Sequence, residues 1–510
     1  MEQYDVIVIG AGNGGLAAAA TLGKKGKKVL VLEKHNLPGG CATSYVRGRF
    51  EFEASLHELC QMGEERGLLR RTLDGLGLDV DWVASDEAFR CVSLDPDEPF
   101  DVTLPADVRG YLDAVEAAAP GSLVSMTRLM ELSRMIQEGI EWLDARGNDP
   151  KLRDLPELLA NYADLLRLVP VPVDEALRRL GVPDKARAIY ESYWNYLGVD
   201  STKMSFAVYA SMTYSYLTQK PWLARYRSHE LSLAFDDAIR RFGGTVWYNS
   251  EAARIRVSAG LVEGVELTDG RFLPCRHVIS NLMPSVVFGR MMEESAVPER
   301  EKKLLRAREL GQSPVTVSLG LDIPYEELGF RGYDVYFFHD ADTSAQYTNA
   351  SSLDNPPDFT ANVLNAVIPD ASPAGTTLLQ LTRFYTGDPF ADVREEDYFS
   401  VKDRVAAELI AEFERLAGVR IRGHIEEIAV TTPVTWARYL GTPRGCVYGY
   451  AGVPPDGLFA RARSAEKLDY TLRGLRFCGG HGSQLDGYSQ AIESGLSAAE
   501  FTLKDLASSR

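Results

Sequence analysis

Residues 4–33 constrain the fold of this chain more than any other segment. An apolar run, Val6–Ile9, leads directly into the glycine-rich turn Gly10-Ala11-Gly12-Asn13-Gly14-Gly15, which satisfies the pattern G-x-G-x-x-G. A helix of small residues, Leu16–Gly23, and a second apolar strand, Val29–Leu32, follow in order, and Glu33 ends that strand. Strand, glycine turn, helix, strand and terminal acid in this succession predict a Rossmann-like α/β unit that binds a nucleotide.

Each part of this unit has a physical role in holding a dinucleotide. Gly10 permits the tight turn, Gly12 lets the backbone approach a pyrophosphate, and Gly15 lets the helix pack near the strand. The helix points its N-terminal N–H groups at the phosphates. Glu33 follows the last glycine at roughly the 20-residue spacing where a carboxylate binds the hydroxyls of an adenosine ribose. The candidate cofactor contacts in this segment are Gly10, Gly12, Asn13, Gly14, Gly15, Glu33 and Lys34.

A second glycine pair, close behind the acid, favours FAD over NAD. It offers another approach without side chains to a phosphate or a ribityl chain, although a simple turn is the alternative explanation. The order E-K-x(4)-G-G, followed by Phe52, Glu53 and His57, resembles the flavin amine oxidase and phytoene desaturase superfamily. The resemblance implies further cofactor contacts at Gly39, Gly40, Cys41, Ala42 and Thr43.

The C-terminal region resembles the last flavin motif of the same superfamily. A short apolar strand, Leu475–Cys478, precedes a glycine-rich loop and a helix expected from about Tyr488 to Leu506. In the family the start of this helix faces the pyrimidine end of the flavin. The family's Asp is replaced here by Gly480, and Asp486 could substitute for it. The candidate contacts are Gly479, Gly480, Asp486, Tyr488, Ser489 and Gln490.

A central segment supplies the third part of the expected cofactor domain. Residues 243–281 read as successive strands with a hairpin, and the resemblance implies a backbone contact to adenine at Ala252 and a further contact at Asn281. We therefore expect an α/β fold with one Rossmann-like FAD-binding domain built from discontinuous segments, residues 1–105, 236–310 and 429–510. A mixed-sheet plus helical substrate-binding domain is expected over residues 106–235 and 311–428.

The expected substrate domain is rich in Tyr, Trp and Met at helical spacing, as in Tyr190, Tyr193, Trp194 and Leu197. Such stripes are ordinarily core, but together they would suit a tunnel for a long apolar ligand. The segment Thr432–Gly449 resembles a signature of phytoene desaturases, carotenoid isomerases and retinol saturases. By contrast, the family's Y-P-x-G-G is replaced by residues 225–230, which contain no glycine, so a C40 carotene cannot be assumed as the substrate.

These patterns predict an FAD-dependent oxidoreductase that desaturates, saturates or isomerises a C–C or C=C bond of a lipophilic substrate such as an isoprenoid, a sterol or an unsaturated fatty acid. No second G-x-G-x-x-G is present, so the electron partner is expected to be oxygen, a quinone or a carrier. Histidine, with an ordinary pKa of about 6.5, can donate or accept a proton. The candidate acid–base residues are His57, Tyr448 and His481, each of which could instead form a structural hydrogen bond.

Two other functions remain open from the sequence. A flavin amine or amino-acid oxidase would need an aromatic cage beside the flavin, and the motif here is not distinctive. A non-enzymatic prenyl-lipid carrier of the GDP-dissociation-inhibitor type has a similar fold but binds no flavin, and its glycine motifs are degraded. Bound flavin would exclude the carrier, and peroxide release from amines would identify the oxidase.

Composition limits the kinds of molecule that the protein is expected to bind and the cellular compartment in which it is expected to work. The net charge of −17 argues against nucleic acid as a partner. The six cysteines are scattered without a C-x-x-C pair, which fits a reducing cytosol, and the seven histidines are dispersed, which indicates no metal site. The first strand follows Met1 at once, and the longest charge-free stretch is too short to span a bilayer. We therefore expect a cytoplasmic protein, and a lipophilic substrate is compatible with peripheral contact at a membrane.

Overall fold

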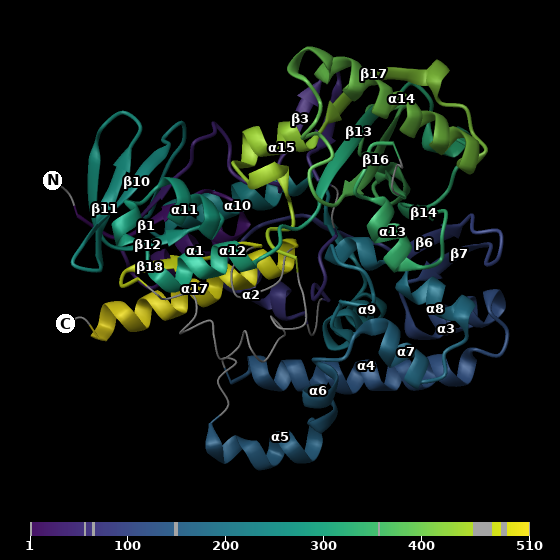
Figure 1. Ribbon diagram of the computed structural model, residues 1–510, viewed down its shortest axis with the longest axis horizontal. Helices are drawn as coiled ribbons and strands as arrows, with labels where there is room; N and C mark the ends of the chain where they lie inside the picture. The colour runs from purple at the N-terminus through teal and green to yellow at the C-terminus, as the bar shows by residue number, and fades with distance from the viewer. Residues whose placement is uncertain are drawn as a thin grey trace.

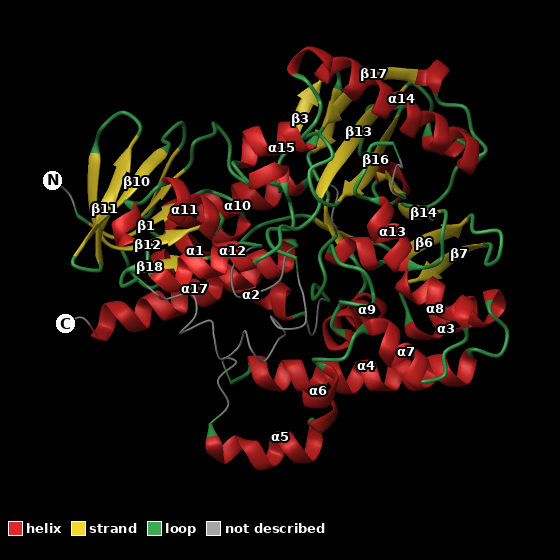
Figure 2. Cartoon of the chain, in the orientation of Figure 1, coloured by secondary structure: helices red, strands yellow, loops and turns green. Residues whose placement is uncertain are grey.

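Two seven-stranded sheets organise the protein, as seen in a computed structural model that describes residues 3–55, 58–63, 67–146, 151–354, 358–451, 472–480 and 487–508. The first sheet lies at the left of the molecule beside both termini, the second at the upper right, and a group of helices lies below the second (Figure 1). Figure 2 shows the same division by element type. The predicted mixture of a Rossmann-like part and a second part with a mixed sheet and helices is confirmed.

The first sheet has a parallel core that begins with the N-terminal strand. Its order is β18-β12-β1-β2-β9, all parallel, and the antiparallel hairpin β10–β11 extends it from β12. Parallel strands covered on both faces read as continuous apolar runs, as these do. The strands are β1 (Tyr4–Ile9), β2 (Val29–Leu32), β9 (Thr245–Trp247), β10 (Ala252–Ser258), β11 (Leu261–Leu267), β12 (Phe272–Ser280) and β18 (Leu475–Phe477).

Three helices from distant parts of the chain pack together against this sheet. They are α1 (Asn13–Lys24), α10 (Ser228–Arg241) and α17 (Tyr488–Ser508), and α1 contacts both of the others. The contact between α1 and α17 is backbone to backbone, because a Cβ built on Gly495 would lie 2.1 Å from the carbonyl oxygen of Gly14. Only glycine allows this approach. The C-terminal helix is thereby held against the first glycine turn.

The second sheet is mixed and draws its strands from both expected domains. Its order is β17-β13-β16-β15-β14-β6-β7, in which the pair β14–β6 is parallel and the other pairs are antiparallel. The strands are β6 (Glu87–Ser93), β7 (Phe100–Pro105), β13 (Ser313–Leu321), β14 (Asp334–Phe338), β15 (Phe359–Val363), β16 (Thr377–Tyr385) and β17 (Ile425–Thr431).

The sheets therefore divide the chain differently from the expected boundaries at residues 105 and 428. The hairpin β6–β7 lies within the expected first segment, yet it pairs with β14, and β17 runs across the boundary at residue 428. The physical reason is that an amphipathic strand pairs with whichever sheet edge the tertiary structure brings beside it. Local sequence does not show that edge.

One helix covers a face of the second sheet, and a group of helices lies below the sheet (Figure 1). Helix α14 (Tyr398–Ala417) packs Leu409 and Phe413 against Val317 and Leu381, which point to one face of the sheet. The helical group consists of α3 (Val108–Ala118), α4 (Leu123–Asp144), α5 (Leu155–Asn161), α6 (Ala163–Leu168), α7 (Val173–Arg179), α8 (Asp184–Glu191) and α9 (Phe206–Gln219).

The aromatic stripe expected on one helix is divided between two elements. Helix α8 ends at Glu191, and Trp194–Leu197 form a separate 3-10 turn that stops at Gly198, whose φ is 73°. The stripe is nevertheless buried, because the break turns these rings into the centre of the helical group.

Short elements connect these parts. They are β3 (Ser44–Arg47), β4 (Phe50–Glu53), α2 (Leu68–Leu76), β5 (Trp82–Ala84), β8 (Trp222–Ala224), α11 (Pro284–Arg290), α12 (Glu299–Ala307), α13 (Thr343–Asn349) and α15 (Pro433–Leu440). Among the helices of the described ranges, none combines the length and the apolar character that crossing a bilayer requires.

Candidate cofactor and substrate site

The carboxylate of Glu33 closes the first glycine turn from the end of the neighbouring strand. Its Oε2 accepts a hydrogen bond of 2.7 Å from the backbone N–H of Ala11, and its Oε1 accepts one of 2.8 Å from that of His35. Each carboxylate oxygen has two lone pairs, so one on each remains for hydroxyl donors. Glu33 is therefore fixed in position, with acceptor capacity to spare.

The second glycine pair lies directly against the first turn. The N–H of Gly39 donates to the carbonyl of Ala11 at 2.7 Å, and Gly39 forms an isolated parallel bridge with Gly12. Gly39 and Gly40 have φ values of +118° and +62°, which favour glycine. Two motifs separated in sequence thus form one backbone surface without side chains.

The amide of Asn281 completes this surface from the end of β12. A Cβ on Gly12 would lie 2.4 Å from Asn281 Nδ2, and one on Gly14 would lie 2.7 Å from Asn281 Oδ1 and 2.7 Å from the backbone nitrogen of Gly479. We call the residues Gly10–Gly15, Glu33, Gly39–Gly40, Asn281 and Gly479 the glycine cradle.

Unpartnered polar atoms in and beside the cradle fit a bound dinucleotide. Asn13 is buried, and its Oδ1 has no hydrogen-bond partner among the described residues; the same holds for the Oγ1 of Thr43. Buried polar groups are normally satisfied, so such atoms point to a ligand or water. A cofactor with phosphates and a ribose would suit this site. The glycine backbone leaves room for the phosphates, Glu33 can accept hydrogen bonds from ribose hydroxyls, and the two unpartnered oxygens can bind further polar groups.

Tyr488 links the start of α17 to the chain that leaves the cradle. Its hydroxyl lies 3.1 Å from the carbonyl oxygen of Cys41 and 3.0 Å from that of Ser55. Burial raises the pKa of the Cys41 thiol to about 12, so this cysteine is a neutral thiol and not a nucleophile at neutral pH. Ser489 and Gln490 lie in the same first turn of α17.

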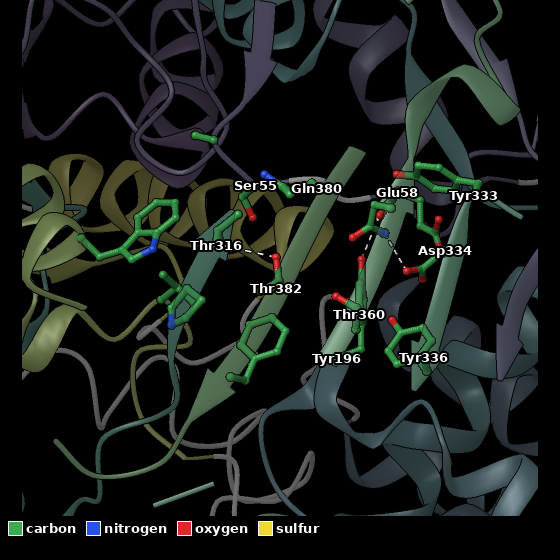
Figure 3. A pocket seen from close by; sticks show the side chains of 16 residues that line it. Ser55, Glu58, Tyr196, Thr316, Tyr333, Asp334, Tyr336, Thr360, Gln380 and Thr382 are labelled. Atoms are coloured by element: carbon green, nitrogen blue, oxygen red, sulfur yellow. Dashed lines mark hydrogen bonds between the residues drawn. The ribbon is translucent and has the colours of Figure 1, made fainter. Parts of the chain in front are cut away.

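A cavity among the described residues begins where this connection ends (Figure 3). It holds about 590 Å³ of empty space, including its open mouth. The N–H of Ala54, a wall residue, donates to the carbonyl of Thr43 at 2.9 Å. Ser55, whose carbonyl approaches Tyr488, is the next wall residue. The cavity therefore adjoins the segments that carry the cradle.

The floor of the cavity is polar because of strand alternation. Successive side chains of a strand point to opposite faces, and here the apolar ones face α14 while the polar ones face the cavity. The register aligns these polar residues across four strands in two rows. One row is Thr316, Thr382, Thr360 and Tyr336, and the other is Gln380, Asn362 and Asp334. We call these two rows the polar floor.

Two buried carboxyl groups meet at one end of the polar floor. The relative exposure of Glu58 is 3% and that of Asp334 is 7%. Tyr193 donates its hydroxyl hydrogen to Glu58 Oε1 at 2.9 Å, and Asn362 donates from Nδ2 to Asp334 Oδ1 at 2.7 Å. Tyr196 donates to the backbone carbonyl of Glu58 at 3.1 Å, and Figure 3 shows Glu58, Asp334 and Tyr196 around the same end of the cavity.

Burial favours the protonated form of both carboxyl groups. Burial raises the pKa of Glu58 well above its usual range, and the neighbouring Asp334 raises it further. Burial likewise raises the pKa of Asp334 to about 7. No Lys, Arg or His lines the cavity in the part of the chain that the structure describes, so no cation there offsets two negative charges. Glu58 and Asp334 form a pair that can both donate and accept a hydrogen bond, which we call the acid pair.

The raised pKa of Asp334 predicts a pH-dependent stability. Between its ordinary value of 3.8 and about 7, the folded protein binds a proton that the unfolded chain has released. This group's stabilising contribution is thus present in acid and is lost as the pH rises through that window. Asp334→Asn removes the titration, so we expect its free energy of unfolding, relative to the wild type, to rise by roughly 2–4 kcal/mol between pH 4.5 and pH 8.

Urea unfolding of flavin-saturated protein at the two pH values measures this change. Asp388→Asn, at an exposed position, is the matched control and should show no such relative gain. Parallel pH profiles for the wild type and Asp334→Asn would contradict the assignment.

A second, smaller cavity of about 380 Å³ lies beside the segment that departs from the family pattern. Arg227 has a φ of +83°, a value that favours glycine, and its guanidinium donates to the backbone carbonyls of Glu51 and Ala371. Ser228 donates from its N–H at 2.6 Å to Glu53, whose pKa burial raises to about 7. The polar replacement for the family's glycines is thus part of a buried network.

The structure describes most of the predicted site residues and brings many of them together. The residues of the cradle, with Cys41 to Thr43 and Tyr488 to Gln490, are brought together from three parts of the chain. Ala252 is the first residue of β10. The side chain of Lys34 does not join the cradle, because its Nζ donates a hydrogen bond of 3.3 Å to the carbonyl of Arg438 on α15. Gly480 follows Gly479 after β18. His57, His481 and Asp486 lie outside the described residues.

Tyr448, the remaining acid–base candidate, is buried beside the cavity. Its ring centroid lies 5.5 Å from that of Phe384, a residue of the cavity wall. The residues that sequence reasoning missed are Glu58 and Asp334. The available signals were weak: Glu58 follows His57, and Asp334 is a charged residue that opens an otherwise apolar strand, DVYFF.

Comparison with known proteins agrees with this geometry. The family described as "NAD(P)-binding Rossmann-like domain" matches residues 8–76. All-trans-retinol 13,14-reductase of Rattus norvegicus is 25% identical over 480 residues, which cover 88% of this chain and 77% of that protein. 4,4'-Diapolycopene oxygenase of Methylomonas is 23% identical and covers 99% of each chain. Prolycopene isomerase of Daucus carota is 21% identical and covers 90% of this chain and 76% of that protein.

Solved structures confirm the fold. A single-site mutant of putrescine oxidase aligns with a TM-score of 0.64 at 14% identity, covering all of this chain and 99% of the other. An oxidoreductase of Methanosarcina mazei aligns with a TM-score of 0.60, also at 14% identity, covering 97% of this chain and 99% of the other. The predicted resemblance to the phytoene desaturase, carotenoid isomerase and retinol saturase group is confirmed, and the chain has the fold shared with flavin amine oxidases.

Proposed function

We propose that this relative of retinol reductases, carotenoid desaturases and prolycopene isomerase is an FAD-dependent oxidoreductase acting on a C–C or C=C bond of a lipophilic substrate. The observation that carries the proposal is that segments adjoining the glycine cradle reach the cavity wall: Thr43, three residues after Gly40, accepts a hydrogen bond from Ala54, and Tyr488 donates one to Ser55. A reacting bond in the cavity would lie next to a cofactor bound in the cradle. The relatives reported above are named as a reductase, an oxygenase and an isomerase, and the hydroxyneurosporene desaturase of Cereibacter sphaeroides is a further relative at 24% identity. Reduction, desaturation and isomerisation are three reactions of such bonds.

The cradle assigns a role to each group of residues in holding FAD. Glu33 would accept hydrogen bonds from the adenosine ribose, and the backbone of Gly10–Gly15 with the start of α1 would face the pyrophosphate. Gly39–Thr43 and the first turn of α17 would border the remainder of the cofactor. When bound, the flavin supplies the site's capacity to take up or release electrons.

The protein's own contribution is placement, exclusion of water and control of protons. The cavity walls would hold the substrate beside the cofactor. Glu58, Asp334 and Tyr448 are among the described groups that could hold a proton near it, while the roles of His57 and His481 stay predictions. We also propose a cofactor domain within residues 1–105, 236–310 and 429–510 and a substrate domain over residues 106–235 and 311–428. The strands β6, β7 and β17 pair in the second sheet, so we move them from the cofactor domain to the substrate domain.

Replacement of Glu33 tests the cofactor assignment. Glu33→Arg removes the acceptors for the ribose hydroxyls, so we expect FAD affinity to fall about 10- to 100-fold. Glu33→Gln keeps one acceptor oxygen and should lose less. The dissociation constant is measured by titrating FAD into stripped protein and following flavin fluorescence. Equal affinities for the three proteins would refute the role of Glu33.

An absorption spectrum followed by anaerobic reduction tests the function itself. We expect a flavin spectrum, and then either reoxidation of the reduced flavin by an unsaturated lipid or a change in the lipid's geometry while the flavin stays reduced. Retinol, prolycopene and unsaturated fatty acids form the first panel. Protein without flavin would favour the prenyl-lipid carrier, and peroxide release from amines without any lipid conversion would favour an amine oxidase.

A location in the cytoplasm and peripheral contact with a membrane stay predictions. The electron partner is proposed to be oxygen, a quinone or a carrier protein. Oxygen consumption by the reduced enzyme separates the first of these from the other two.

A further inference from the structure

The polar floor is an unusual surface for a cavity that would hold only hydrocarbon. It consists of threonine, amide and tyrosine side chains aligned across β13, β16, β15 and β14, and it ends at the acid pair. Covering such groups with an apolar chain costs free energy because it removes water without providing new hydrogen bonds. A hydrocarbon would therefore be penalised at this end of the cavity.

The acid pair adds a specific recognition property to this end. Glu58 receives a hydrogen bond from Tyr193, and Asp334 receives one from Asn362, so both carboxyl groups are held in place. A carboxyl that carries a proton donates one hydrogen bond, and its ionised neighbour only accepts. A hydroxyl group has the complementary capacity, since it donates one hydrogen bond and accepts others.

We propose that the acid pair and the polar floor bind a hydroxyl at the polar end of the substrate, so that the enzyme acts on a lipid alcohol and discriminates against the corresponding hydrocarbon. This inference rests on the proposed function, since it names the substrate class of the same cavity. The hydroxyl lies at the Glu58–Asp334 end, and the apolar part of the substrate extends along Trp436, Phe384 and Val447. The polar end thus recognises the hydroxyl, and the apolar walls recognise the hydrocarbon part of the substrate.

Paired ligands test the inference on the wild-type holoenzyme. The probes are all-trans-retinol, geranylgeraniol and oleyl alcohol, each compared with the analogue in which CH2OH is replaced by CH3. Binding to the oxidised enzyme is measured under anaerobic conditions, from the change in the flavin absorption spectrum and from equilibrium dialysis. We expect at least one alcohol to bind about tenfold or more tightly than its hydrocarbon. Equal affinities within every pair, or no binding of any alcohol, would overturn the inference.

Substitutions then locate the discrimination. Glu58→Gln combined with Asp334→Leu removes both carboxyl groups, so the ratio of affinities should fall toward one. Glu191→Gln is the matched control: Glu191 is also buried, and burial raises its pKa to about 8, but it lies on α8 and does not line the cavity. Its ratio should equal that of the wild type, and an unchanged ratio in the double variant would overturn the assignment to the acid pair.

The design separates this inference from the proposed function. Protein that lacks flavin contradicts the proposed function whatever its ligand preference. If the protein contains flavin and converts lipids but binds the alcohol and the hydrocarbon equally, the lipid-alcohol inference is contradicted and the proposed function is not. If the double variant loses its flavin spectrum, the paired-ligand result on the wild type decides the question alone.

Discussion

Gly12→Val should give folded protein that contains no flavin. The backbone at Gly12 has a φ of −76°, which any residue adopts, so the substitution adds no backbone strain. Its Cβ would meet only the end of the Asn281 side chain within 3.0 Å, and that amide can rotate away. The same Cβ and its methyl groups would fill the space through which the backbone approaches a pyrophosphate. Loss of cofactor is thus expected without loss of fold.

The ratio of absorbance at 450 nm to that at 280 nm measures this effect. We expect flavin content to fall by at least about tenfold in Gly12→Val and by less in Gly12→Ala, in line with the bulk introduced. Gly289→Val is the matched control, since a Cβ on Gly289 meets nothing within 4 Å. Circular dichroism and thermal unfolding of stripped protein check the fold. Retention of full flavin content by Gly12→Val would refute the cradle as the pyrophosphate site.

Gly495→Val should destabilise the whole cofactor domain. The Cβ at this position would lie 2.1 Å from the carbonyl oxygen of Gly14 and 2.9 Å from its carbonyl carbon, and both atoms are backbone. Neither can rotate away, so α17 would have to separate from α1. Overpacking of this kind costs on the order of 3 kcal/mol or more, a large part of the 5–15 kcal/mol that typically stabilises a fold.

Chemical unfolding, followed by circular dichroism on stripped protein, measures the loss. The matched control on the same helix is Glu500→Val, which is exposed and should change the free energy of unfolding by roughly 0.5 kcal/mol. Accumulation of Gly495→Val in inclusion bodies, with soluble Glu500→Val, would support the same conclusion. A midpoint for Gly495→Val equal to that of the wild type would contradict the close packing of the two helices.

The contrast between the two glycines separates binding from folding. Gly12 clears space for a ligand, whereas Gly495 clears space for another helix. Both are glycines next to the same turn, yet only the tertiary structure shows what each would meet. The first is expected to change flavin content and the second stability.

Much of the cofactor site was accessible from sequence because its signals are local. The runs VIVI and VLVL and the intervening glycines predict β1, α1 and β2, which the structure contains as β1 (Tyr4–Ile9), α1 (Asn13–Lys24) and β2 (Val29–Leu32). The helix expected from Tyr488 is also present, two residues longer at its C-terminal end. Short-range periodicity and glycine spacing are sufficient for such elements, since each is stabilised by its own pattern of burial.

The cavity with its polar floor could not be predicted from the sequence in the same way. Alternation along β13 or β16 indicates that one face is polar, but not that four polar faces lie side by side. The order β13-β16-β15-β14 does not follow the chain, so Thr316 meets Thr382 and Asp334 meets Asn362 only after the sheet has formed. The break of the aromatic stripe at Glu191 has a similar origin, because the fold ends α8 there and turns Trp194 inward.

The sequence by itself therefore determined the Rossmann-like part, its glycine turns and the position of the acid that ends β2, because these depend on residues close together in the chain. Tertiary structure alone decided the cavity and its acid pair. Glu58 follows the first cofactor segments and Asp334 opens a strand far along the chain, and each would be an ordinary exposed carboxylate on its own. Their raised pKa values arise because folding buries both in one cavity, away from water and beside each other.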